Sequence, residues 1–199
     1  DGMKLSFIEK KDFYKEANKY IYNIINDISH NEDNVIMDQL LLPFNMYRVD
    51  NYFGDDLRAI IVERDPRDVF ILNKYVWKGK KISIPYPTDV ETFCKYYKKM
   101  RKSEHLTNSK MVLRVRFEDL IYKYEETVKT IENFVGFDSD KHINKKKRFN
   151  PDLSIKNTQL FNGKTDYENE IKIIEKELKE YLYEFPYNLN NLTADTIEF

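Results

Sequence analysis

The chain contains 199 residues, with 33 Lys and Arg against 34 Asp and Glu, so its formal net charge is −1 at pH 7. This length is within the range of one domain, and the balanced charge argues against a general nucleic-acid binder. Hydrophobic residues make up 41% of the chain and aromatic residues 15%, which excludes disorder over most of its length. We expect one domain over residues 1–186, followed by a polar tail over residues 187–199.

A single cysteine, Cys94, excludes a framework of internal disulfides and leads us to expect a cytoplasmic protein. Cys94 has helical spacing from Val90 and Tyr97, which predicts a packed thiol. The sequence has no apolar run of about 18 residues, so it predicts no transmembrane helix. It also has no segment of the signal-peptide type, with a basic start and an apolar centre.

In chain order, the first predicted element is a helix over residues 10–28, because its apolar residues recur on one face. After a loop, the apolar segment 34–43, which ends in a proline, predicts a buried strand. A second apolar run at 57–63 predicts another strand. Helices are expected over residues 66–77 and, after a loop with two prolines, over residues 88–102.

In the second half, β-branched alternation over residues 110–117 predicts a third strand. The next helix is expected over residues 120–135, where Gly136 stops it. Residues 139–164 have no clear period, so we expect an irregular segment around a short helix, and a last helix is expected over residues 171–185.

Strands that alternate with helices indicate parallel βαβ units, so the predicted fold is an α/β sandwich with a parallel sheet flanked by helices. Three strands form a small sheet, and we expect part of it to lie outside this sequence.

The second strand leads into "RDPRDVF", residues 64–70, at the edge of the sheet where α/β folds bind ligands. Asp65 fits a helix N-cap, Pro66 fits the first helical position, and Asp68 fits the third, where a carboxylate can meet free amides. Helix initiation therefore explains these three residues but not Arg64 or Arg67. The guanidinium of Arg64 suits a phosphate, and pairing with a neighbouring carboxylate is an equally open interpretation from the spacing alone.

A second motif, "RFEDL…FVGF", begins at Arg116, about fifty residues later. The two motifs in this order resemble sulfotransferases that use 3'-phosphoadenosine 5'-phosphosulfate (PAPS), and the resemblance extends over residues 35–185. It implies a fold like that of P-loop NTPases. It also implies that Arg64 binds the 3'-phosphate of the donor, and that Phe117, where the family often has Tyr, lies near the nucleotide. Glu118 and Asp119 fit helix-start residues better than catalysts.

Further donor ligands follow from the same resemblance. The family usually has a serine at the position of Leu72, and Asn73 beside it could supply a hydrogen bond instead. The segment "FNPDLSIKNTQLFNGK" resembles the family's late loop, which makes Ser154, Lys156 and Asn157 candidates for contact with the 3'-phosphate. An ordinary surface loop is the alternative. The basic run 145–148 is either a solvated stretch or a region that steers an anionic donor.

The family's phosphate loop, typically similar to Pro-Lys-Ser-Gly-Thr-Thr, is missing from the sequence. We expect it, together with the first strand, either upstream of Asp1 or lost from this domain. The stretch "NGKT", residues 162–165, mimics the end of a Walker A motif, but its spacing and context do not fit one.

Asp38 is the one titratable residue in the predicted strand 34–43 and is therefore the candidate catalytic base. A carboxylate at the mouth of an apolar strand can have a raised pKa. The alternative is a buried aspartate that holds a loop amide.

The sequence thus predicts an enzyme that transfers a sulfuryl group from PAPS to a hydroxyl acceptor, with a carbohydrate as the expected acceptor class. We expect no metal cofactor and no nucleic-acid partner. Two alternatives stay open: a P-loop kinase-like enzyme, and a degenerate module of the same fold that binds a nucleotide or a protein.

Overall fold

The computed structural model describes residues 7–30, 34–39, 45–46, 49–53, 56–77, 84–104, 110–162 and 166–188. Its strands are β1 (Ala59–Glu63) and β2 (Val112–Arg116). Its α-helices are α1 (Lys10–Ser29), α2 (Val49–Tyr52), α3 (Pro66–Ile71), α4 (Val90–Glu104), α5 (Asp119–Tyr122), α6 (Tyr124–Val135), α7 (Pro151–Ser154) and α8 (Glu168–Glu177). A π-helical stretch, Leu72–Trp77, continues α3, and short 3-10 turns cover Ser139–Lys141, Ile155–Asn157 and Lys179–Tyr181.

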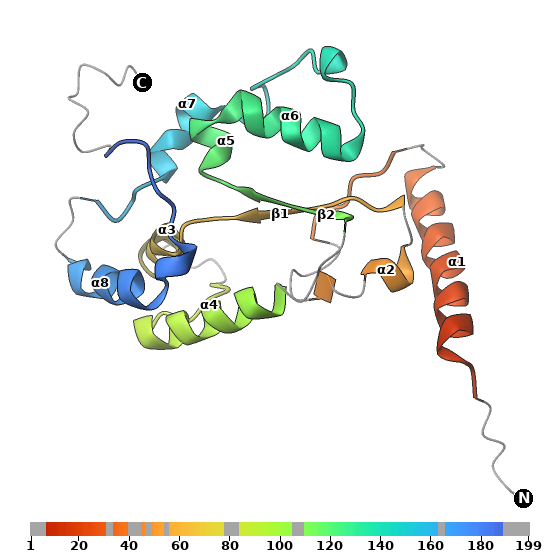
Figure 1. Ribbon diagram of the computed structural model, residues 1–199, viewed down its shortest axis with the longest axis horizontal. Helices are drawn as coiled ribbons and strands as arrows, with labels where there is room; N and C mark the ends of the chain where they lie inside the picture. The colour runs from red at the N-terminus through yellow and green to blue at the C-terminus, as the bar shows by residue number, and fades with distance from the viewer. Residues whose placement is uncertain are drawn as a thin grey trace, which may run out of the picture.

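The two strands pair in parallel, with Ile61 opposite Arg114, and helices cover both faces of the sheet (Figure 1). Helices α5 and α6 lie over one face, and α4 lies over the other with α8 beside it. The predicted parallel sheet flanked by helices is therefore confirmed in this mixed α/β structure. Within the described residues the sheet has two strands rather than the predicted three.

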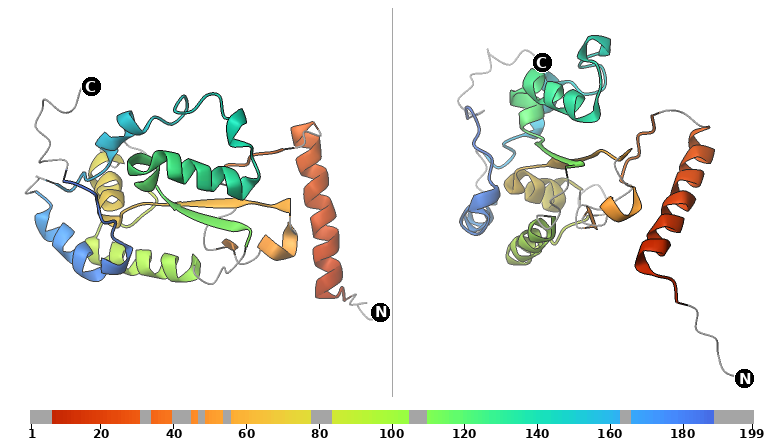
Figure 2. Two further views of the ribbon diagram at one scale, coloured as in Figure 1. Left: turned by 45° about the horizontal axis from the view of Figure 1, so that its top comes forward. Right: turned by 45° about the vertical axis from the view of Figure 1, so that its right-hand side comes forward.

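Helix α1 stands at the amino ends of the strands, apart from these layers, as Figure 2 shows from two further directions. Its contacts run through α2 and the residue after it. The Asn18 amide donates a hydrogen bond of 2.8 Å to the Tyr52 carbonyl, and the Tyr22 hydroxyl donates one of 2.8 Å to the Phe53 carbonyl. The predicted helix 10–28 is thus confirmed, but it is an attachment to the sheet layers and adds no buried residue to them.

The larger apolar core lies between α3, α4 and α8. Its centre is fully buried and comprises Phe70, Phe93, Ile174 and Leu178. Burial of side chains of this size contributes about 2 kcal/mol each relative to exposure, so these three helices form one packed unit. Cys94 belongs to this core, as its spacing predicted.

A charged cluster fixes α4 against the sheet. The Arg101 guanidinium lies 2.6 Å from Glu63 at the end of β1 and 2.8 Å from Glu104. From β2, Arg114 reaches the same two carboxylates at 3.2 and 3.1 Å. Because both acids are nearly buried and share two arginines, the cluster sets the position of the sheet relative to α4.

The predicted strand at 34–43 is wrong for its described part. Residues 34–39 form no strand, and their side chains are exposed, with Ile36 at 90%. Strand formation requires a pairing partner, and these residues take none in the described sheet. Residues 40–43 lie outside the described residues.

Three predicted helices differ in detail. The helix after β1 changes to π-helical geometry at Leu72, and the helix predicted over 120–135 breaks at Lys123, where φ is −135° and ψ is 43°. The last helix ends at Glu177, and from Leu182 the backbone is extended. The predicted polar tail lies, from residue 189 onward, outside the described residues.

Gly136 ends α6 in the left-handed region, with φ 75° and ψ 25°, and the next amide, that of Phe137, donates a 2.8 Å hydrogen bond back to Glu132. A Cβ at this position would meet nothing within 4 Å, so the cost of a side chain is backbone strain alone. We expect Gly136→Ala to reduce the free energy of unfolding by about 1 kcal/mol. Gly136→Asn should cost less, because Asn tolerates this region, and denaturant titration of both variants tests the order.

Candidate functional site

Arg64 lies where β1 ends and α3 has not yet begun, next to the end of β2. Its guanidinium carbon is 4.6 Å from the centre of the Phe117 ring, which directly follows β2. Its Nη2 donates a hydrogen bond to the backbone carbonyl of Asn157, from the turn after α7. Three of the predicted donor ligands, from segments about 40 to 90 residues apart, are therefore in contact.

The charge on Arg64 is partly removed from water. Burial lowers the pKa of Arg64 from its ordinary value, and the nearby carboxylates of Asp68, Glu118 and Asp65 oppose this shift. Its Nε is buried and has no hydrogen-bond partner among the described residues. An anion that accepted from this edge of the guanidinium would satisfy a donor that the described protein atoms leave unused.

Asp65 is the N-cap of α3, as the sequence predicted, and it also joins distant segments. Its Oδ1 accepts from the Arg67 amide at 2.9 Å, and its Oδ2 accepts from the Tyr183 amide at 2.8 Å. The guanidinium of Arg67 binds both oxygens, at 2.9 and 2.8 Å. The Asp65 side chain is fully buried, so this pair ties the start of α3 to the segment after α8.

The sequence predicted that the Asp68 carboxylate meets the free amides of its own helix, and this prediction is wrong, although the side chain is fully buried. It accepts from the amides of Gln159 at 2.9 Å and Leu160 at 2.7 Å instead. Burial, followed by repulsion from Asp65, raises the pKa of Asp68 to about 7. The loop that contains Asn157 is thereby attached to α3.

Glu118 follows β2 and caps α5 without a side-chain bond to that helix. One carboxylate oxygen accepts from the Asp65 amide at 2.8 Å, while the other is buried without a hydrogen-bond partner among the described residues. Burial raises the pKa of Glu118. The predicted helix-start role is therefore only partly right, because the side chain connects the ends of the two strands.

The remaining predicted ligands have other environments. Asn73 is fully buried, and its amide donates to the Tyr86 carbonyl at 2.9 Å and accepts from the Tyr86 amide at 3.2 Å. Ser154 ends α7 and is half-buried, and Lys156 is exposed in the turn Ile155–Asn157. Asn157 itself contacts Arg64 through its backbone and not through its side chain.

The candidate base, Asp38, lies in the exposed segment 34–39, toward the amino ends of the strands in Figures 1 and 2. Arg64 follows the carboxyl end of β1, at the opposite side of the sheet. The prediction rested on burial at the mouth of a strand, and neither the burial nor the strand is found in the described part of that segment. Among the described residues, no hydrogen bond or ion pair joins Asp38 to Arg64, Phe117 or Asn157.

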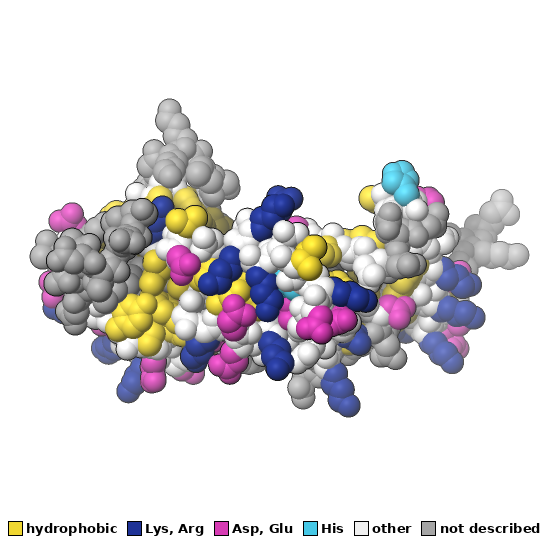
Figure 3. Space-filling view, turned by 90° about the horizontal axis from the view of Figure 1, so that it is seen from above, with side chains coloured by type: hydrophobic (Ala, Val, Ile, Leu, Met, Phe, Trp, Pro, Cys, Tyr) yellow, Lys and Arg dark blue, Asp and Glu magenta, His cyan; other side chains and the backbone are white. Residues whose placement is uncertain are grey.

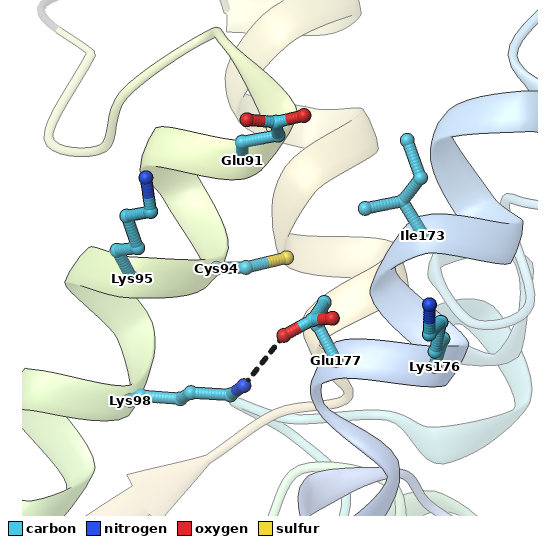
Figure 4. Close-up of a pocket in the computed structure, with 7 residues that line it drawn as sticks. All are labelled: Glu91, Cys94, Lys95, Lys98, Ile173, Lys176 and Glu177. Carbon is cyan, nitrogen blue, oxygen red and sulfur yellow. Dashed lines mark hydrogen bonds and ion pairs between the residues drawn. The ribbon is translucent and has the colours of Figure 1, made fainter.

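A separate cavity of about 330 Å³ lies between α4 and α8 (Figure 4). Cys94 points into it, and the Lys98 ammonium, 2.8 Å from a Glu177 oxygen, bridges the two helices. Burial raises the pKa of the Cys94 thiol to about 11, so the thiol stays protonated at neutral pH. The lining contains none of the residues around Arg64.

The face that carries α6 and the segment after it shows no single basic patch (Figure 3). Lys and Arg side chains alternate there with Asp and Glu. Lys145, the first residue of the basic run, pairs with Glu125 at 3.4 Å. For Lys145, the interpretation of the run 145–148 as a solvated stretch is therefore sufficient.

Comparison with protein-family models, curated proteins and solved structures found no match for this chain. Its class is accordingly given by its own fold: a mixed α/β protein with a small parallel sheet, whose strand ends carry a buried cluster of arginines and carboxylates. Among the described helices, none is both long and apolar enough to cross a membrane.

Asp65→Ala should strongly destabilise the protein, because it leaves the nearly buried guanidinium of Arg67 without its main counter-ion. Removal of one partner of a buried pair costs about 3 kcal/mol or more. The matched control is Glu175→Ala, which removes the more exposed partner of the same arginine and should cost less than about 1 kcal/mol. Equal losses in the two variants, measured by denaturant titration, would contradict this account.

Asp68→Asn should change how stability depends on pH. The folded state raises the pKa of Asp68 from 3.8 to about 7, so between these values folding favours the protonated form. This contribution is fully present below about pH 4 and is lost as the pH rises to about 7. We expect the free energy of unfolding of the wild type to fall relative to that of the variant over this interval, and parallel curves for the two proteins would refute the assignment.

Proposed function

We propose that this chain contains the region of a PAPS-dependent sulfotransferase that binds the 3'-phosphate of the donor, on a fold like that of P-loop NTPases. The observation that carries the proposal is the meeting of Arg64, Phe117 and Asn157 beyond the ends of β1 and β2. Each was predicted as a donor ligand from a different part of the sequence. Ligands of open α/β folds bind at this edge of the sheet, which supports the same location.

The chemistry of Arg64 suits a nucleotide phosphate. Its guanidinium stacks on an aromatic ring, which limits its rotation and leaves edge donors for an anion. Partial burial strengthens a charge-assisted hydrogen bond, because the local dielectric constant is lower than that of water.

PAPS supplies an activated sulfuryl group, and its transfer to a hydroxyl depends mainly on positioning and charge stabilisation. In this proposal Arg64 holds the nucleotide, and the acceptor is a hydroxyl compound, with a carbohydrate as the preferred class. Asp38 is retained as a base only as a prediction, to be tested by the loss of turnover in Asp38→Asn.

A second candidate is a domain that binds the nucleotide without transferring the sulfuryl group. Two observations favour it: Leu72 occupies the position where the family usually has serine, and the amide of Asn73 is occupied by the backbone of Tyr86. Both candidates require Arg64 to bind the 3'-phosphate, and turnover with PAPS distinguishes them.

We expect 3',5'-bisphosphoadenosine, at about a hundredfold excess over its Kd, to stabilise the chain by about 2.7 kcal/mol. This corresponds to an increase in Tm of about 5 °C or more for a chain of this size. Arg64→Ala should abolish the shift, and Arg64→Lys should reduce it, because an ammonium lacks the planar fork of donors.

The matched control is Arg58→Ala, which removes the same kind of side chain from an exposed position just before β1. It should leave the shift unchanged. The proposal fails if millimolar bisphosphate does not change the Tm of the wild type, and the site is wrong if Arg64→Ala and Arg58→Ala respond alike.

A further inference from the structure

The carboxylate of Asp68 connects α3 to Gln159 and Leu160, which lie 91 and 92 residues later in the sequence. Its two oxygens accept from two consecutive backbone amides, at 2.9 Å from Gln159 and 2.7 Å from Leu160. The side chain is fully buried, so these bonds are shielded from water. Gln159 has φ 53°, in the left-handed region, which turns the two amides toward one acceptor group.

The same segment carries the backbone carbonyl that meets Arg64. Asn157 lies two residues before Gln159, and Thr158 between them is buried and bonded to the Tyr122 hydroxyl at 2.6 Å. The short stretch 157–160 is thus attached on one side to α5 and on the other to α3. Loss of the attachment to Asp68 would release the backbone amides of Gln159 and Leu160, while the Gln159 side chain would keep its bond to the Tyr187 carbonyl at 2.9 Å.

Several charged or titratable groups face Asp68. Arg64 comes from the end of β1, Asp65 from the N-cap of α3, and Tyr122 from α5, and each interacts with the Asp68 carboxylate electrostatically. Glu118, at the start of α5, also interacts with Arg64 and with Asp65. Burial and the neighbouring Asp65 raise the pKa of Asp68 to about 7, so both protonation states occur at neutral pH.

We infer that Asp68 is a positioning residue of the nucleotide site: its ionised carboxylate holds the backbone of residues 157–160 in the arrangement that Arg64 and a bound 3'-phosphate require. That Asp68 holds this part of the backbone follows from its contacts. That it thereby affects ligand binding rests on the proposed function. Protonation converts one acceptor oxygen into a donor, so it removes one of the two attachments.

An alternative role for Asp68 is that of a simple counter-ion to Arg64, and the two roles predict opposite signs. A counter-ion competes with an anionic ligand, so its neutralisation should strengthen binding of the bisphosphate. A positioning residue should weaken binding on neutralisation, even though a negative charge near Arg64 is removed. The amide of Asp68→Asn can accept through one oxygen only and has nearly the same shape.

The binding experiment is calorimetric titration of 3',5'-bisphosphoadenosine into the wild type and Asp68→Asn at about pH 8. We expect at least a tenfold increase in Kd for the variant. The matched control is Asp152→Asn, which removes a carboxylate from an exposed position in α7, on the same loop, and should leave Kd unchanged. Tighter or unchanged binding by Asp68→Asn overturns the inference.

Amide hydrogen exchange tests the same inference without a ligand. In Asp68→Asn the residues 155–162 should exchange faster than in the wild type, while β1 and α4 keep their protection. Detachment of this segment, unlike global unfolding, removes the two amide bonds that lower the pKa of Asp68 while its side chain stays buried. In the wild type the protection of these residues, corrected for intrinsic rates, should therefore fall from about pH 8 to about pH 6, and the variant should show no such change. Exchange of this segment that is equal in the two proteins and independent of pH overturns the inference.

The two proposals can fail separately. If the wild type does not bind the bisphosphate, the proposed function fails, and the exchange experiment still decides whether Asp68 holds the loop. If Asp68→Asn does not fold, the pH dependence of exchange in the wild type gives the same decision without a variant.

Discussion

A buried carboxylate, that of Asp65, joins the parts of the structure on which the site depends. Its oxygens bind the Arg67 side chain and the Tyr183 amide, and its own backbone amide donates to Glu118 at the end of β2. The end of β1, the start of α3, the end of β2 and the segment after α8 therefore meet at one residue. The Asp65 side chain is fully buried, so water could not replace it as the acceptor for the donors that it binds. Loss of any of these bonds would therefore be costly, and the bonds hold the four segments in their relative positions.

This arrangement has an electrostatic consequence for any ligand. When all groups are ionised, Asp65, Asp68 and Glu118 carry more negative charge than Arg64 and Arg67 carry positive charge, so the region has a net negative charge of one unit. An anion would therefore enter a region whose own carboxylates repel it. Burial raises the pKa of Asp68 to about 7 and also raises that of Glu118, so the region is less negative than full ionisation would make it.

The sequence was sufficient to predict structure where the pattern depends on residues that are close together in the chain. The apolar run of β1, the Asp65-Pro66 start of α3 and the glycine that ends α6 were all predicted, because caps and strand ends depend on neighbours in the chain. That Arg64, Phe117 and Asn157 belong to one site was expected from a resemblance rather than from spacing, and their direct contacts were not predicted. The partners of Asp68 had no local signal, since Gln159 lies 91 residues away. The strand containing Asp38 was predicted from a short apolar run, and such a run does not specify what it pairs with.

The two arginines of "RDPRD" differ in a way that only their surroundings reveal. Arg67 uses its guanidinium fully: it binds both oxygens of Asp65, Glu175 at 3.0 Å and the Tyr183 carbonyl at 3.3 Å, and it stacks at 4.0 Å on the ring of Phe161. Its pKa is raised, because the bonds to carboxylates outweigh its burial. Arg64 has one backbone acceptor and one ring, and its pKa is lowered by burial. A cation in this condition would gain from an anionic ligand what Arg67 already has from the fold. The contacts therefore explain Arg67 as a structural residue and support the proposal that Arg64 binds the ligand.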